Sequence, residues 1–288
     1  MAYQTGTYSG PVDLLTLLRT FVLANGWTQN GWTADGTGNR LHIQKGSMYY
    51  NLRSGAGEDD VFAGTSNATT TPYAIYLNGS TGYAGGSPWD RQPGSPESET
   101  GEGAAAGKVS QTQATYHMFA QADTIILFVE CDDQYRQIMF GQTSAGYHIF
   151  GASGNARWPE DDAFLVNASD GSMSALYEGV WTFGDSTSKE LQLPNNSYSI
   201  LNRTILVRSA VQFRGNALLL PAHIMRTSGS GQISTPYFYL GDIRGLKSMY
   251  VGGHSDGDVI TYAGDEYVVS VTDPSLSGIY QAGVAALK

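Results

Sequence analysis

Residues 116–141, YHMFAQADTIILFVECDDQYRQIMFG, contain three short strand candidates in close succession. The turns between them are Ala122-Asp123 and Asp132-Asp133. Such tight turns between short runs are typical of antiparallel neighbours, so the stretch predicts a β-meander. The three candidates are residues 116–121, 124–130 and 135–141.

The composition agrees with a β-rich fold. Glycine accounts for 36 of 288 residues, which suits a chain with many turns, since ordinary usage is about 7%. Charged residues make up only 15%, against about 25% in typical domains, and low charge suits surfaces that pack against other subunits. The 18 tyrosines exclude a disordered chain, which has few aromatic residues.

Charge and cysteine content exclude several classes of partner. A formal net charge of −10 argues against nucleic acid, because phosphate binding needs clustered Lys and Arg. No apolar run approaches the roughly 20 residues of a membrane helix, so no membrane partner is expected. With Cys131 as its one cysteine the chain forms no internal disulfide, and its first residues lack a secretory pattern. We expect folding in a cytosol.

An amphipathic helix is predicted over residues 11–24. Pro11 suits a first helical position, and Asp13 complements the helix dipole. Gly26 is expected to end the helix as a C-terminal cap. An apolar stripe on one face must be buried, in the chain's own core or against a neighbour. The stripe comprises Leu14, Leu15, Leu17, Leu18, Phe21 and Val22.

The residues between this helix and position 80 predict a small antiparallel sheet. Asn30-Gly31 is a turn signal between Trp27-Thr28 and Trp32-Thr33. We therefore expect an α+β fold, mostly β, in which the N-terminal helix packs on this sheet and β-rich meander or sandwich-like regions follow. Further strands are predicted at residues 41–45, 48–52 and 73–77.

Residues 83–113 differ in character, because Gly85-Gly86-Ser87-Pro88 and Pro93-Gly94-Ser95-Pro96 are turn sequences. A loop this long is uncommon inside a compact domain. Two interpretations stay open. The segment is a surface linker with Trp89 packed on its own domain, or an arm that Trp89 anchors to a neighbouring subunit. The predicted division of the chain is 1–82 (α+β domain), 83–113 (loop or arm) and 114–288 (β-rich domain).

Strand signals weaken over residues 143–200 and then return. The clearest hairpin pairs residues 259–262 with 267–271 across Ala263-Gly264-Asp265-Glu266. The other predicted strands are residues 205–207, 211–213, 218–220, 223–226, 237–240 and 249–251.

No catalytic, cofactor-binding or metal-ligating residues are assigned. Residues 101–106 imitate a dinucleotide fingerprint, but they do not follow a strand. None of the five histidines lies three or four residues from another, so the usual zinc spacing is missing. Residues 252–258 imitate one imperfect calcium nonapeptide, and a polar turn before the hairpin explains them as well. Acidic pairs such as Asp132-Asp133 suit solvated turns better than glycosidase carboxylates.

Three stretches occur in a recognisable order. MAYQTGT at residues 1–7 leads into Asp13-Leu14-Leu15, Leu18-Arg19 and Gly26-Trp27-Thr28. YRQIMFG follows at residues 135–141. YLGDIRGL stands at residues 239–246, before the hairpin through Tyr267-Val268-Val269. This order resembles virion structural proteins of tailed bacteriophages, which are often found among tail genes.

The resemblance implies a non-enzymatic structural component of the tail, baseplate or neck, without a cofactor. Such a protein is made in the host bacterial cytoplasm and assembles in the virion with copies of itself and other phage structural proteins. The alternatives are a receptor- or glycan-binding module at the tail tip, which exposed aromatics with convergent polar groups would favour, and a carbohydrate-active enzyme, which a cleft with two carboxylates would favour. The interface candidates are Leu14, Leu18, Phe21 and Trp89.

Overall fold

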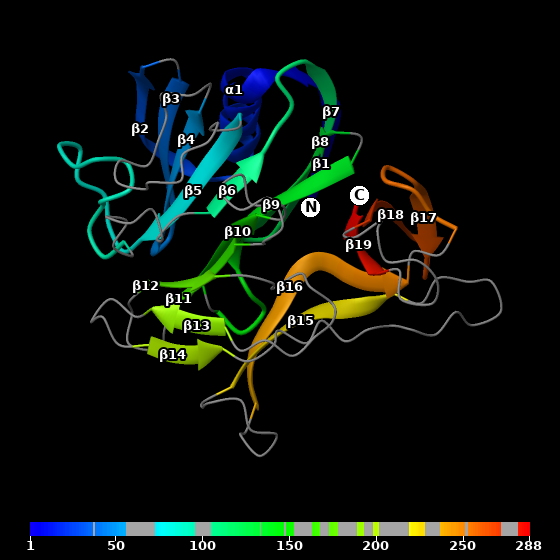
Figure 1. The fold of residues 1–288 in the computed structure, drawn as a ribbon. Coiled ribbons are helices and arrows are strands. Elements are labelled where there is room, and N and C mark those ends of the chain that lie inside the picture. The colour runs from blue at the N-terminus through cyan, green and yellow to red at the C-terminus, as the bar shows by residue number, and fades with distance from the viewer. Residues whose placement is uncertain are drawn as a thin grey trace.

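The computed structural model contains three antiparallel β-sheets and one α-helix in the part of the chain that it describes (Figure 1). The mostly-β class predicted from the sequence is confirmed. In the same residues, no helix is long and apolar enough to cross a membrane. The described residues are 1–36, 38–55, 73–95, 105–132, 134–146, 148–152, 163–167, 173–177, 189–192, 198–201, 219–227, 237–250, 253–271 and 282–288.

The helix α1 spans Gly10–Ala24, with Pro11 in its first turn as predicted. Gly26 follows with φ +81°, a conformation that favours glycine. The Trp27 N–H donates to the carbonyl oxygen of Val22 at 3.2 Å, which closes the Schellman motif that this glycine allows. The predicted C-terminal cap is therefore confirmed.

The largest sheet has nine strands and is built around the predicted meander. Residues Ala122 and Asp132 occupy the two tight turns with φ of 52° and 53°. The N-terminal strand β1 was not predicted, and it pairs along its whole length with β7 at one edge of this sheet. The order is β1-β7-β8-β9-β10-β11-β12-β13-β14. The bounds are β1 Ala2–Ser9, β7 Gln113–Gln121, β8 Thr124–Cys131, β9 Gln134–Gln142, β10 His148–Ala152, β11 Ala163–Asn167, β12 Met173–Tyr177, β13 Lys189–Gln192 and β14 Tyr198–Leu201.

The second sheet has the order β2-β3-β4-β5-β6. The predicted Asn30-Gly31 turn is wrong: β2 continues through it, and the register with β3 shifts between Gln29 and Gly31 as a β-bulge. Asn30 donates to the side chain of Gln44 on β3 at 3.1 Å, which supports the bulge. Strand β6 lies inside the segment predicted as a loop or arm. The bounds are β2 Thr28–Asp35, β3 Gly38–Lys45, β4 Met48–Gly55, β5 Ala74–Ser80 and β6 Ala105–Lys108.

The third sheet has the order β15-β16-β19-β18-β17. The predicted hairpin is confirmed, and its turn residues Ala263 and Gly264 both have positive φ, as a two-residue primed turn requires. The strands predicted at residues 237–240 and 249–251 are two ends of one long strand, β16. Those predicted at 205–207 and 211–213 lie outside the described residues. The bounds are β15 Leu220–Thr227, β16 Tyr237–Tyr250, β17 Val259–Tyr262, β18 Asp265–Val271 and β19 Ala282–Leu287.

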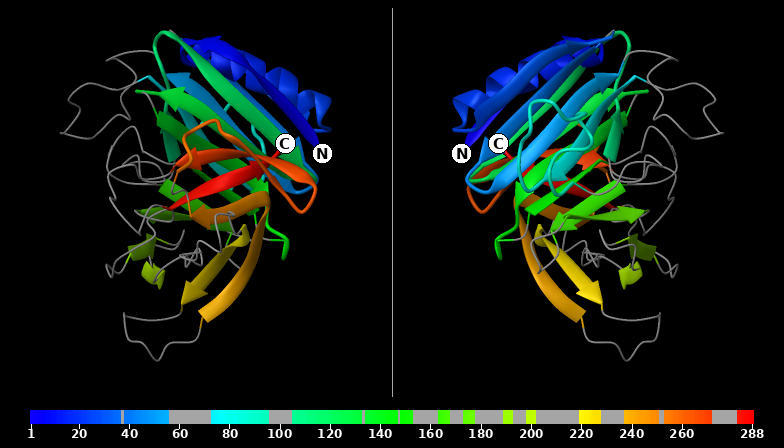
Figure 2. Two further views of the ribbon diagram at one scale, coloured as in Figure 1. Left: turned by 90° about the vertical axis from the view of Figure 1, so that its right-hand side faces the viewer. Right: turned by 90° about the vertical axis from the view of Figure 1, so that its left-hand side faces the viewer.

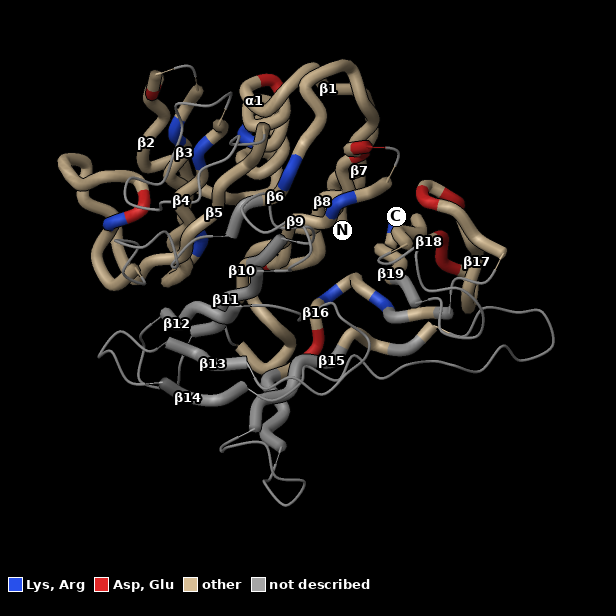
Figure 3. Tube along the Cα trace, viewed as in Figure 1, with Lys and Arg blue, Asp and Glu red and all other residues tan. Residues whose placement is uncertain are grey.

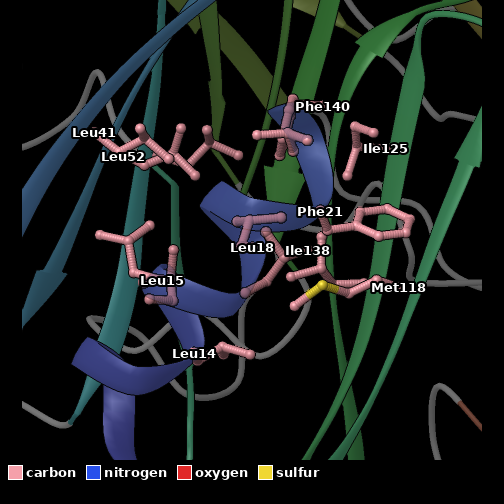
Figure 4. Packing of buried hydrophobic residues seen from close by; sticks show 14 of the residues in the cluster. Leu14, Leu15, Leu18, Phe21, Leu41, Leu52, Met118, Ile125, Ile138 and Phe140 are labelled. Carbon is pink, nitrogen blue, oxygen red and sulfur yellow. The ribbon is translucent and has the colours of Figure 1, made fainter. Parts of the chain in front are cut away.

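One hydrophobic core joins α1 to the first two sheets. Leu14, Leu18 and Phe21 point from the helix into this core (Figure 4), which also contains Leu52 of β4 and Phe140 of β9. The helix therefore packs between the small sheet and the nine-stranded sheet, so the predicted packing on the small sheet is only part of its contacts. The ranges predicted as separate N-terminal and C-terminal domains share this core and the β1–β7 pairing.

The third sheet packs on the opposite face of the nine-stranded sheet. The side chain of Gln137 on β9 donates to the hydroxyl of Ser270 on β18 at 3.0 Å. Asp256, in the turn before β17, accepts the backbone N–H of Tyr135 at 2.9 Å and that of Val271 at 2.6 Å. At β9 the nine-stranded sheet thus has the helix-containing core on one face and the third sheet on the other.

Candidate functional site

The four predicted interface residues are buried within the chain itself. Leu14 and Leu18 are 0% exposed and Phe21 is 4% exposed, all in the shared core. Trp89 is 7% exposed, and its ring lies 6.2 Å from that of Tyr76 on β5. The structure therefore places Trp89 on its own subunit, and none of the four offers an exposed side chain to a partner.

Histidine, cysteine and acidic side chains do not gather into a metal site: the described residues contain no group of three that could hold an ion. Cys131 is buried, and burial raises the pKa of its thiol to about 11, so the thiol stays protonated at neutral pH. Residues 253–258 form the polar turn that the sequence analysis favoured for the calcium-like stretch, and the Asp256 carboxylate there is bonded to backbone N–H groups.

The outer face of the second sheet carries cross-strand rows of polar and aromatic residues. The register places His42 opposite Asn51, and Asn51 opposite Asn78. Leucines and isoleucines alternate with these residues and point into the core, as a half-buried strand requires. The neighbouring rows are Thr33, Arg40, Arg53 and Tyr76 on one side, and Thr28, Gln44, Tyr49 and Ser80 on the other.

A buried hydrogen-bond chain begins in the central row and crosses to Ser80 in the neighbouring row. The Nδ1 of His42 lies 2.7 Å from the amide oxygen of Asn51, so that ring nitrogen donates. Asn51 donates in turn to the hydroxyl of Ser80 at 3.0 Å, and Ser80 donates to the carbonyl of Gly82 at 2.9 Å. Burial lowers the pKa of His42, which keeps its ring neutral near pH 7.

Residues 81–95 cover part of this polar face as a compact loop. Its ends meet where the Thr81 N–H donates to the carbonyl of Pro93 at 2.9 Å. Gln92, 3% exposed, fills the interior and accepts the N–H of Ala84 at 2.7 Å. The Tyr83 ring lies 5.0 Å from that of His42 and is 37% exposed. The loop is held by its own side chains, as in Ω-loops.

Two arginines converge on one carboxylate beside the covered region. Arg40 binds both oxygens of Asp35, at 2.6 and 2.7 Å, and Arg53 binds one of them at 2.6 Å. The Arg40 hydrogen bond, with help from Arg53, lowers the pKa of Asp35. The three side chains are partly exposed.

A second polar network fixes β1, β7 and β9 to one another. The hydroxyl of Tyr3 lies 2.8 Å from Nδ1 of His117, and that of Tyr135 lies 2.8 Å from Nε2. Burial lowers the pKa of His117, and the Lys288 charge lowers it further. Burial raises the pKa of Tyr135 to about 12. Both ring nitrogens of His117 thus have a tyrosine hydroxyl as their partner, and this network links the three strands.

The edges of the three sheets differ in how they are protected against pairing with another chain. Edge strands β6, β14 and β17 have only four residues each. Strand β2 contains the bulge, and β15 contains Pro221 and two register shifts. Strand β1 has eight residues, pairs with β7 without a shift and contains neither a charged residue nor proline.

The surface of α1 that faces away from the core is also nearly uncharged. Asp13 and Arg19 are the only charged residues of the helix. Asp13 accepts the Ser9 N–H at 2.9 Å, and Arg19 lies over the ring of Trp32 at 5.0 Å. The exposed side chains are Asp13, Thr16, Thr20 and Ala24, with Val12, Leu17, Arg19 and Leu23 half-buried beside them.

Sequence reasoning missed both of these features. It treated residues 1–7 as a matter of targeting and resemblance, although Tyr3, Thr5 and Thr7 alternate as strand residues do. It also considered only the buried stripe of the helix and not the lack of charge on the opposite face. The sequence matches no protein-family model, and a search of curated proteins returns no similar protein.

Proposed function

We propose that this chain is a non-enzymatic structural component of a tailed-phage virion, in the tail, baseplate or neck, and that it acts through symmetric subunit–subunit contacts. One observation carries the proposal: β1 is a long, uncharged and regular sheet edge, which natural proteins leave unprotected where another chain covers it. Synthesis in the host cytoplasm and a final place in the virion belong to the same proposal.

The stretches that carry the resemblance to virion proteins lie in regular elements of the fold, and this supports the proposal. These stretches fall on β1, on α1 with its C-terminal cap, on β9, on β16 and on β18. Of these elements, β1, α1 and β9 contribute to the shared core, and β16 and β18 belong to the third sheet. The resemblance thus concerns the framework of the fold, which is the part that a structural subunit must keep.

The experiment is to label intact particles of a phage that encodes the chain with antibodies against it, and to image them by electron microscopy. Deletion of the gene is the second arm. We expect label at one position on each particle and incomplete particles from the deletion. Complete, infectious particles without the chain would reject the proposal.

A second candidate function is receptor or glycan binding at the tail tip. The exposed ring of Tyr83 lies beside partly exposed polar side chains on the outer face of the second sheet, and an aromatic ring with convergent polar groups suits a sugar. A glycan array with the whole chain tests this candidate. Binding that Tyr83→Ala abolishes, and that Tyr262→Ala leaves intact, would favour it over the assembly function.

A further inference from the structure

The chain passes from β1 to α1 without an intervening loop. Strand β1 ends at Ser9, and α1 begins at Gly10. Both views of Figure 2 show α1 beside β1, so the chain doubles back at this point. Gly10 has φ +80°, a backbone conformation that favours glycine, and this conformation makes the reversal possible. A connection this short is the kind of hinge at which two copies of a protein exchange an element.

Strand β1 is held in place by residues that lie far away along the chain. Tyr8 is 1% exposed, and its hydroxyl donates to the carbonyl oxygen of Glu130 at 2.7 Å. The Ser110 N–H donates to the same hydroxyl at 2.9 Å. In the described part of the chain, the hydrogen bonds made by β1 side chains reach residues 102 to 122 positions away. The site that binds β1 therefore does not require a β1 from the same copy.

The helix on the other side of the hinge is anchored in its own subunit. Leu14, Leu18 and Phe21 are buried in the shared core, so α1 stays in place if β1 moves. Among the described residues, one hydrogen bond with a side chain links the two elements, from the Ser9 N–H to Asp13 at 2.9 Å, and it is exposed. A rotation about Gly10 would thus free β1 and leave the rest of the fold intact.

We infer that two copies of this chain exchange β1, so that β1 of each copy pairs with β7 of the other. The inference rests on the proposed structural function and names the element that joins the subunits. The occupant of the β7 edge is given by the structure, which pairs Ala2–Ser9 with that edge along the whole strand. Reciprocal exchange keeps these contacts and closes a two-fold pair.

The charge of β1 agrees with such an exchange. The strand contains no charged residue, and in Figure 3 it shows neither basic nor acidic colour. It therefore enters a second copy of a chain with net charge −10 without adding like-charge repulsion. Because β1 makes the same contacts in both forms, the balance between them depends on the hinge and on the concentration of the chain.

Mixed single-cysteine chains test the inference directly. Thr7 on β1 and Thr115 on β7 are cross-strand partners. A Thr7→Cys chain and a size-tagged Thr115→Cys chain are unfolded together, refolded at high concentration and treated with a short bis-maleimide. We expect a covalent heterodimer, because only exchange places residue 7 of one chain beside residue 115 of the other. The matched control replaces the second chain with tagged Thr261→Cys, at an exposed position on β17, and should give no heterodimer.

A double variant with Thr7→Cys and Thr115→Cys in one chain reports pairing within a copy. If this variant cross-links internally while the mixed chains give no heterodimer at any concentration, the inference is overturned. The parent chain serves as the blank, because its own Cys131 is buried. Particle labelling decides the proposed function separately, so a chain that is found in particles but never forms the heterodimer refutes the exchange alone.

The hinge supplies a second readout. A Cβ at residue 10 would come no closer than 4.0 Å to another atom, the carbonyl oxygen of Gln111, so Gly10→Ala acts through its positive φ. The closed hinge requires this φ and the opened hinge does not. Gly10→Ala should therefore raise the ratio of exchanged dimer to monomer about tenfold, as measured by gel filtration after refolding.

Gly46→Ala is the matched control for the hinge variant. Gly46 lies in the turn between β3 and β4 with φ +59°, and a Cβ there would meet no atom within 4 Å. The two substitutions thus impose a similar backbone cost, but only the one at residue 10 acts on the hinge. Gly46→Ala should leave the ratio of dimer to monomer unchanged, and equal ratios for the two variants would overturn the inference.

Discussion

The hydroxyl of Tyr50 and the backbone of Gly141 bind each other across the core, 2.6 Å from hydroxyl to carbonyl oxygen, and the Gly141 N–H donates back at 3.2 Å. Tyr50 belongs to β4 in the second sheet, and Gly141 to β9 in the nine-stranded sheet. The same hydroxyl lies 3.0 Å from the carbonyl oxygen of Ile149 on β10. One buried phenol therefore fixes the spacing of two sheets.

Tyr50→Phe should lower the free energy of unfolding by about 1–3 kcal/mol, because it leaves buried backbone groups without their partner. Urea denaturation measures the loss. The control is Tyr49→Phe, on the half-exposed outer face of the same strand, which should change stability by less than about 0.5 kcal/mol. Equal effects of the two substitutions would contradict the role given to the Tyr50 hydroxyl.

Leu18→Ala should lower the free energy of unfolding by about 2–5 kcal/mol, because Leu18 is fully buried where α1 packs against both sheets. The measurement is a thermal melt of the full chain. Thr20→Ala, two positions along on the exposed face, should be neutral or slightly stabilising, because alanine has the higher helix propensity. A Leu18→Ala melt that matches the parent chain would mean that the helix does not pack as described.

Asp35 should make stability depend on acid pH. The pKa of Asp35 is lowered in the folded state, chiefly by its hydrogen bond with Arg40. The ionised carboxylate therefore stabilises the fold fully at pH values above the unfolded-state pKa of about 3.9. This stabilisation is lost as the pH falls through the folded-state pKa. The stability difference between the parent chain and Asp35→Asn should therefore be largest near pH 6 and shrink below about pH 4. Urea midpoints at a series of pH values test this, and a difference that is constant with pH would refute it.

Asp256 should affect the pH dependence of stability in the direction opposite to Asp35. Burial raises the pKa of this carboxyl, so the folded state holds its proton more tightly than the unfolded state. Relative to Asp256→Asn, the parent chain should therefore gain stability as pH falls through the folded pKa toward about 3.9. The same pH series measures both variants. Parallel curves for the Asp35 and Asp256 variants would show that one of the two environments is misassigned.

Trp89→Ala should speed tryptic cleavage after Arg91 by tenfold or more in the isolated chain. Trp89 holds the 81–95 loop onto Tyr76, and Arg91 is already exposed within that loop. Pro88→Ala, at an exposed neighbouring position, is the control and should change the rate little. Fast cleavage of the parent chain itself would instead favour the arm interpretation, in which Trp89 waits for a neighbouring subunit.

Local patterns in the sequence were enough for the elements whose partners lie close along the chain. The helix at residues 11–24, the meander at 116–141 and the hairpin at 259–271 depend on nearby turns and on periodicity, and all three are confirmed. Asn30-Gly31 misled the prediction, because the same pair that favours a hairpin turn also fits a bulge when the partner strand continues.

Elements with distant partners were not recoverable in this way. Strand β1 forms by pairing with β7, which is far away in the sequence. Strand β6 lies in a run of alanine and glycine and forms by pairing with β5. Nothing in Ala105–Lys108 alone favours a strand. The sequence analysis named Leu14, Leu18 and Phe21 as interface candidates, and the structure buries all three in the subunit's own core.

The distance along the chain between β1 and β7 has a consequence during synthesis. Tyr3 and its partner His117 are 114 positions apart. At about 5–20 residues per second, the ribosome needs on the order of ten seconds to make the strand that completes this edge. Through that interval the apolar stripe of α1 has been made but the nine-stranded sheet that covers it has not. The newborn chain therefore has its greatest need of a chaperone early, before residue 121 emerges, and slow long-range pairing extends that interval.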